Sequence, residues 1–236
     1  MVRTPAPKDR LIVALDYPAG EEALALVERL GERILWYKVG LQLFTAEGPG
    51  IVRRLLASGK EVFLDLKLHD IPTTVAKAVA SCAGIGAGLL TLHASAGADA
   101  LREASGVRRA LGAPMKLLGV TVLTSDRSDA EASMRRRVLD LAERAADAGL
   151  DGVVAPAASL PDLREAFAGR LDVLCAGIRP AGSPAHDQDW VATPEWALRE
   201  GARWLVVGRP ITAAPSPEAA SDRILEAMAG GVGTGL

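Results

Sequence analysis

The sequence predicts a single-domain α/β protein of the (β/α)8 TIM barrel class, and three observations lead to that prediction. Short apolar runs alternate with amphipathic segments, and each pair occupies roughly 25–35 residues, the length of a βα unit. The apolar runs number eight, and polar side chains gather where they end. Eight such units in 236 residues fit a barrel of this class, which typically needs about 250 residues.

The expected strands follow one another along the whole chain. Their near-continuous apolar character is typical of parallel strands that are covered on both faces. The strands are 11–16, 36–41, 61–68, 89–95, 116–123, 152–156, 172–177 and 204–210. Helices are expected between them, for example at 21–30, where apolar residues recur at helical spacing, and at 135–149, where Gly149 closes the segment. A doubly wound open sheet is the alternative arrangement of the same elements.

Composition and charge narrow the class of protein. No linker rich in Gly, Ser or Pro divides the chain, so we expect one domain over residues 1–236, with short flexible ends at about 1–9 and 229–236. The formal net charge of -2 gives no bias toward nucleic acid or an acidic membrane. The chain starts without the apolar core of a signal peptide, and no apolar run approaches the ~18–20 residues that span a bilayer. We therefore expect a cytoplasmic protein that binds neither nucleic acid nor membranes.

Side chains with catalytic chemistry fall at the carboxyl ends of the expected strands. In barrel enzymes this end carries the active site, whereas polar residues placed for solubility would fall equally at both ends. The sequence therefore predicts an enzyme. The residues concerned are Asp16, Lys38, Asp65, Lys67, His93, Thr124, Arg179, Gly208 and Arg209.

The stretch FLDLKLHDIPTTV at 63–75 carries the most informative group of charges. On an extended strand Asp65 and Lys67 share a face, and Lys38 can approach from the neighbouring strand. A lysine between two carboxylates stays protonated, so Lys67 is suited to donate a proton rather than to attack a carbonyl. The alternatives are a structural ion-pair network and a magnesium site built on Asp65 and Asp70. Because Lys38 and Lys67 would compete with a metal ion for the same space, we expect no metal.

The stretch WLVVGRPIT at 204–212 predicts a phosphate site. Gly208 lets backbone N–H groups approach an anion, and Arg209 can bind phosphate through two N–H donors. Phosphate sites in barrels commonly follow the seventh and eighth strands. The segment 176–190, which is rich in Gly and Pro and carries Gln188, has the composition of a lid. The alternatives are an ordinary turn with a solvated arginine and a passive surface loop.

Taken together, six stretches resemble the orotidine 5'-phosphate decarboxylase family. They are ALD (14–16), YKVGLQLF (37–44), FLDLKLHDIPTTV (63–75), HASAG (93–97), GIRPAG (177–182) with Gln188, and VVGRPIT (206–212). The pattern DxKxxD followed by IPxT is specific, whereas GRPIT is shared more widely among phosphate-binding barrels. The resemblance implies a homodimer of (β/α)8 barrels that converts orotidine 5'-monophosphate to UMP and carbon dioxide in de novo pyrimidine biosynthesis. It also implies that the reaction needs no metal or organic cofactor.

The resemblance implies a role for each residue that matches the family pattern. Lys67 is the proton donor beside Asp65, Lys38 completes an alternating row of charges, and Asp70 reaches in from the partner subunit. The other residues are implied in substrate binding: Asp16 and Thr74 at the ribose hydroxyls, with Thr74 also acting across the dimer interface, Thr124 at the pyrimidine, Gln188, Gly208 and Arg209 at the phosphate, and Arg179 at the hinge of the lid.

Two other functions fit parts of the pattern. A sugar-phosphate decarboxylase or aldolase of the same barrel superfamily has a similar Asp-x-Lys strand but uses magnesium to stabilise an enediolate. A barrel that binds a phosphorylated ligand without catalysis would share the phosphate site. The row of charges in 63–75 and Gln188 favour the decarboxylase over both.

Overall fold

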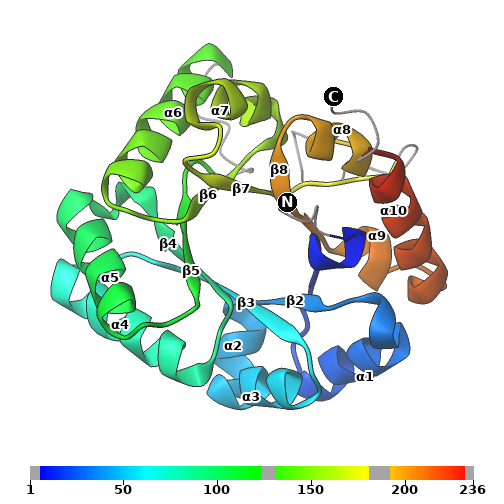
Figure 1. Ribbon diagram of the computed structural model, residues 1–236. Coiled ribbons are helices and arrows are strands. Elements are labelled where there is room, and N and C mark those ends of the chain that lie inside the picture. Colours follow the sequence, from blue (N-terminus) through cyan, green and yellow to red (C-terminus); the bar gives the residue numbers. More distant parts are fainter. Residues whose placement is uncertain (1–5, 124–130, 181–191, 232–236) are drawn as a thin grey trace.

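The computed structural model describes residues 6–123, 131–180 and 192–231, and these form a closed barrel of eight parallel strands. Each strand pairs with the next in chain order, and β8 closes the ring onto β1. Helices form an outer ring around the strands (Figure 1). The (β/α)8 prediction is therefore confirmed, and the doubly wound open sheet is wrong. The strands are β1 (Leu11–Ala14), β2 (Trp36–Gly40), β3 (Glu61–Leu68), β4 (Leu89–His93), β5 (Lys116–Val120), β6 (Gly152–Ala155), β7 (Asp172–Cys175) and β8 (Ala202–Val207).

The helices begin and end at residues that suit those positions. Proline stands in the first turn of α4, where its missing N–H costs no hydrogen bond, and Gly86 closes that helix in the left-handed conformation at φ 97°. The described helices are α1 (Gly20–Leu30), α2 (Leu41–Glu47), α3 (Pro49–Ala57), α4 (Pro72–Ile85), α5 (Ala98–Ala110), α6 (Glu131–Asp147), α7 (Leu160–Phe167), α8 (Pro194–Arg199), α9 (Arg209–Thr212) and α10 (Pro217–Gly231). Short 3-10 turns lie at Pro7–Asp9, Gly31–Arg33, Ala94–Ala96 and Ala157–Ser159.

Two apolar clusters hold the barrel together. The larger cluster lies between the outward faces of the strands and the helices, and Leu64 of β3 is part of it with Leu66 and Leu68 packed against it. The smaller cluster fills the barrel interior, and its members are Ile12, Ala14, Phe63, Leu89, Leu118, Leu174, Trp204 and Val206. Because side chains fill the interior, the barrel is closed along its axis and is not a pore. The cluster also forms an apolar floor beneath the carboxyl ends of the strands.

Most strands end one to three residues earlier than the apolar pattern suggests. β1 ends at Ala14 rather than at residue 16, and β5 ends at Val120 rather than at residue 123. β8 ends at Val207, and Gly208 precedes α9 instead of extending the strand. The residues beyond the observed strand ends, which include Asp16 and Arg209, belong to the loops or short helices that follow the strands at the carboxyl end of the barrel. These loops therefore carry the candidate site.

Three smaller expectations concern the ends of the chain, the cysteines and membranes. The ends expected to be flexible lie partly outside the described residues, so their flexibility stays a prediction. Cys82 and Cys175 are free thiols and both are buried. In the described part of the chain, no helix is both long enough and apolar enough to cross a membrane.

Candidate active site

A cavity of about 440 Å³ opens at the carboxyl ends of the strands. Its floor is apolar and includes Phe63 and Leu174 from the interior cluster. Seven residues expected at the site line this cavity together, although they come from five different strands or the loops after them. They are Asp16, Lys38, Asp65, Lys67, Arg179, Gly208 and Arg209. The predicted gathering of polar residues at this end of the barrel is therefore confirmed.

The charged side chains on one wall of the cavity alternate in sign. The Lys67 Nζ donates a hydrogen bond to Asp65 Oδ2 at 2.7 Å, and the same oxygen lies 3.8 Å from Lys38 Nζ. Lys38 Nζ in turn donates to Asp16 Oδ1 at 2.7 Å. The side chains of Lys38 and Asp65 are each 13% exposed, so these two charges interact with little screening by water. Two ammonium groups thus share one carboxylate inside the cavity.

The backbone at Lys67 departs from the regular strand that the sequence predicts. The pairing of β3 with β4 shifts between Leu64, opposite Leu90, and Leu68, opposite Leu92, so β3 carries extra residues between these points. Lys67 lies in this bulge with φ 49°, the left-handed region that a residue with a Cβ rarely adopts. The expectation that Asp65 and Lys67 meet on one face is confirmed by their contact, but a bulge rather than a regular pleat produces it. Strain of this kind typically marks a functional site.

Gly40 at the end of β2 allows the charges to lie this close. A Cβ at this position would lie 2.9 Å from Lys38 Nζ and 3.3 Å from Asp16 Oδ1. A side chain at residue 40 would therefore displace the Lys38 ammonium from its place beside Asp16. The sequence contains this glycine in YKVGLQLF, but nothing in the one-dimensional pattern shows which charge it accommodates.

The opposite wall of the cavity carries two arginines. Arg179 is only 7% exposed, and its Nη1 donates to the backbone oxygen of Ile178 at 2.9 Å, while its buried Nε has no hydrogen-bond partner. Burial, together with the positive charge of Arg209, lowers the pKa of Arg179 below its usual range. Arg209 itself is exposed, and two neighbouring cations at a cavity wall suit a bound anion. The backbone of Gly208 lines the cavity beside them.

Four of the expected site residues are not part of this cavity as described. Asp70 and Thr74 are exposed at the start of α4, and the Asp70 carboxylate accepts a hydrogen bond from the N–H of Ile71 at 2.6 Å. Neither residue lines the cavity of its own chain. Thr124 and Gln188 lie outside the described residues.

Two histidines lie beside the row of charges. The rings of His69 and His93 are 5.4 Å apart with a 44° angle between their planes. Burial lowers the pKa of His93 below its usual value, and the nearby His69 and Lys67 lower it further, while Asp65 acts in the opposite direction. The balance of these effects favours the neutral imidazole of His93. Within the described residues, no three His, Cys, Asp or Glu side chains are grouped as metal ligands would be.

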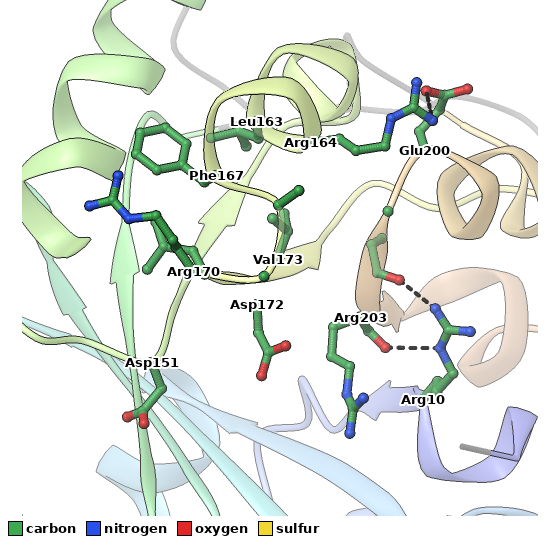
Figure 2. Close-up of a pocket in the computed structure, with 15 residues that line it drawn as sticks. Arg10, Asp151, Leu163, Arg164, Phe167, Arg170, Asp172, Val173, Glu200 and Arg203 are labelled. Carbon is green, nitrogen blue, oxygen red and sulfur yellow. Dashed lines mark hydrogen bonds and ion pairs between the residues drawn. The ribbon is translucent and has the colours of Figure 1, made fainter. Parts of the chain in front are cut away.

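A second cavity, of about 410 Å³, lies at the other end of the barrel, where β6, β7, β8 and β1 begin. Figure 2 shows Arg10 bonded to backbone oxygens of β8 and Arg164 paired with Glu200. Asp172 also lines it and accepts from Lys116 at 2.6 Å. Polar groups at this end of a barrel normally serve stability. None of the residues expected at the site lies here.

Comparison with models of known protein families identifies the family of this chain. A family model described as the orotidine 5'-phosphate decarboxylase / HUMPS family matches residues 9–224, which include every strand of the barrel. The chain belongs to this family. It is therefore an enzyme of the orotidine 5'-phosphate decarboxylase family, as the six stretches of sequence predict.

Individual relatives extend the similarity over nearly the whole chain. An orotidine 5'-phosphate decarboxylase of Rhodopseudomonas palustris is 45% identical over 234 residues, which cover 96% of this chain and 97% of the relative. One from Nostoc sp. is 43% identical over 232 residues, covering 93% and 97%. The crystal structure of orotidine 5'-phosphate decarboxylase from Lactobacillus acidophilus superposes with a TM-score of 0.79 at 33% identity, covering 93% of this chain and 98% of that one.

One residue in contact with the row of charges was not predicted from the sequence. Thr91 of β4 is fully buried, and its hydroxyl donates to Asp65 Oδ1 at 2.9 Å. A polar residue inside the otherwise apolar run LLTLH is the signal that could have drawn attention to it, because buried polar side chains need partners.

Proposed function

We propose that this enzyme converts orotidine 5'-monophosphate to UMP and carbon dioxide in de novo pyrimidine biosynthesis, without a metal or an organic cofactor. The observation that carries the proposal is the alternating row Asp16, Lys38, Asp65 and Lys67 along one wall of a cavity whose other wall holds two arginines. Membership of the decarboxylase family supports the same reaction.

The substrate spans the cavity from the arginines to the lysines. Its phosphate binds to Arg209, Arg179, the Gly208 backbone and Gln188, as the proximity of the buried Arg179 to the exposed Arg209 supports. The ribose hydroxyls bind to Asp16, whose carboxylate also holds Lys38. The pyrimidine then lies over the apolar floor with its C6 carboxylate toward Asp65 and Lys67, and Thr124 contacts the ring.

The bond that breaks joins C6 to the carboxylate carbon. Its electron pair stays on C6 as a carbanion in the plane of the ring, where the π system delocalises it poorly. The Lys67 ammonium, held at 2.7 Å from Asp65, stabilises that charge because it is positioned before the charge develops. Lys67 Nζ then transfers its proton to C6, which yields UMP, and the amine regains a proton from solvent. The positive charge that stabilises the carbanion comes from the protein, so no metal ion is needed for it.

The site is completed by a second subunit in this proposal. Asp70 and Thr74 are exposed and do not line the cavity of their own chain, which supports a role in the neighbouring site of a homodimer. Ile71 lies between them and is 66% exposed, as expected of an apolar residue that a partner covers. Asp70 of the partner subunit would approach Lys67 from the side opposite Asp65, and the partner's Thr74 would contact the ribose.

The experiment that tests the proposal follows the orotate absorbance after purified protein is mixed with orotidine 5'-monophosphate in excess chelator. Loss of the absorbance with release of one carbon dioxide per UMP formed supports the proposal. A protein that binds UMP tightly but releases no carbon dioxide contradicts it and favours a binding barrel. Activity that appears only when magnesium is restored contradicts the cofactor-free chemistry.

A further inference from the structure

The hydroxyl of Thr91 connects the two residues at the centre of the site. It accepts a hydrogen bond from the backbone N–H of Lys67 at 2.9 Å and donates one to Asp65 Oδ1 at 2.9 Å. Thr91 is 0% exposed, so water cannot replace either bond. The other oxygen of the same carboxylate, Asp65 Oδ2, holds Lys67 Nζ.

The bulge in β3 explains why a hydroxyl is needed at residue 91. Because the register of β3 shifts between Leu64 and Leu68, the N–H of Lys67 bonds to a side chain of β4 instead of to a backbone oxygen. A buried N–H without a partner would be costly. A threonine hydroxyl can accept at its oxygen while it donates its one proton elsewhere, so the bond to Lys67 leaves that proton for Asp65.

We propose that Thr91 is a positioning residue for the decarboxylation, an inference that rests on the proposed function. It does not contact the substrate. It stabilises the left-handed backbone of Lys67, at φ 49°, and fixes the rotation of the Asp65 carboxylate, so that the ammonium of Lys67 is held where C6 loses its carboxylate. Catalysis that depends on preorganised charge is sensitive to displacements of about 1 Å.

The test compares three variants with the wild-type enzyme. Thr91→Val keeps the shape of the side chain but removes the hydroxyl, and Thr91→Ser keeps the hydroxyl. Thr121→Val is the matched control, because Thr121 is also buried, at 5% exposed, and its hydroxyl donates to the backbone oxygen of Val154 at 2.8 Å without contacting Asp65 or Lys67. Thermal unfolding and circular dichroism confirm that each variant is folded at the assay temperature.

We expect Thr91→Val to lower kcat by about 10- to 100-fold while KM and the Kd of UMP change by less than about 3-fold, since the groups that bind phosphate are untouched. Thr91→Ser should keep kcat within about 3-fold of wild type, because it supplies the same two hydrogen bonds. Thr121→Val should be destabilised to a similar degree as Thr91→Val but keep its kcat. This split between stability and kcat separates positioning from a purely structural role.

Three results overturn the inference: an unchanged kcat in Thr91→Val, a Thr91→Ser variant as impaired as Thr91→Val, or an equal loss in Thr121→Val. If Thr91→Val does not fold, the comparison of Thr91→Ser with Thr91→Cys decides, because a thiol is a weak donor and acceptor and Thr91→Cys should lose kcat. A wild-type protein without turnover overturns the proposed function and this inference together. If the wild type is active and Thr91→Val has the same kcat, only this inference is overturned.

Discussion

The two ends of the barrel carry similar charged residues but use them differently. At the end where the strands begin, Asp172 binds Lys116. Glu200 binds Arg164, and Arg10 donates to the backbone oxygens of Ala202 and Arg203 (Figure 2). Arg10 also lies close to Arg203, and burial and then the charge of Arg203 lower the pKa of Arg10. At the end where the strands finish, one carboxylate, Asp65, is shared by two lysines. A buried arginine there lies close to another arginine.

The difference shows which charges are arranged for stability and which for chemistry. In a one-to-one ion pair, or where an arginine donates to backbone oxygens, the bonded groups have their partners within the protein and need no ligand. Neighbouring guanidinium groups occur at both ends, so they do not distinguish them. What distinguishes the carboxyl end is a carboxylate shared by two lysines on a strained strand, in a cavity where a ligand can contact it. Residue type alone does not distinguish the two ends, because both are rich in Asp, Lys and Arg.

The largest expected effect comes from replacing a lysine at each end of the barrel, Lys67 and Lys116, by alanine. Lys67→Ala should lower kcat by at least about 1,000-fold, because it removes both the proton donor and the charge that stabilises the carbanion. Lys116→Ala, at the opposite end, should leave kcat within about 2-fold. Both variants are assayed by loss of orotate absorbance, with folding checked by circular dichroism. Comparable activity in the two variants would contradict the distinction between the ends.

The next effect concerns the arginines. Arg209→Ala should lower kcat/KM for orotidine 5'-monophosphate by about 10- to 100-fold, mainly through KM, because charge-assisted hydrogen bonds to the phosphate are lost. The exposed Arg170 at the other end provides the control, and Arg170→Ala should have no effect. Turnover of orotidine, which lacks the phosphate, should be insensitive to Arg209→Ala. An equal loss with both substrates would mean that Arg209 does not bind the phosphate.

At the end where the strands begin, the expected effect is on stability. Arg10→Met should lower the free energy of unfolding by about 1–3 kcal/mol, because two backbone oxygens of β8 lose a partly buried donor. Its kcat should stay at the wild-type value at temperatures where it is folded. Urea titration followed by fluorescence of the tryptophans measures the first quantity. A fall in kcat without a loss of stability would be the opposite of what we expect for this end.

The smallest effect is the titration of His93 beside the active site. Since its pKa is lowered in the folded protein, the unfolded chain binds the proton more readily below about pH 6.5, and stability falls as the pH decreases through that region. Proton NMR should give His93 a midpoint below about 6.5. His69→Gln should raise that midpoint only in part, because burial, the larger cause, remains. A full return to the ordinary value would show that His69 is the main cause.

The barrel was predictable because the pattern that indicates it is repeated along the chain. Each βα unit repeats the same alternation, so an error in one unit, such as the late end assigned to the strand at 116–123, leaves the fold unchanged. The cavity residues were predictable for a related reason, since parallel strands bring their carboxyl ends together and Lys38, Asp65 and Arg179 all follow that rule. The resemblance to the decarboxylase family added the roles of these residues.

Features that depend on contacts between distant strands were not predictable. The bulge at Lys67 arises from the register of β3 against β4, which no pattern within residues 61–68 encodes. The two bonds of Thr91 follow from that register, so this residue was passed over as part of an apolar run. Gly40 was recognised only as part of a motif, and the reason for it is the distance between Lys38 and Asp16 across two strands.

The left-handed backbone of Lys67 has a consequence for engineering this enzyme. Glycine and asparagine adopt that conformation more readily than lysine does, so either one at residue 67 would relieve strain in the native state. Relief of this strain favours replacements at a position where the proposed chemistry needs an amine, and the loss of the ion pair between Lys67 and Asp65 opposes them. Selection for thermostable variants of this barrel should hold residue 67 constant or select for turnover at the same time.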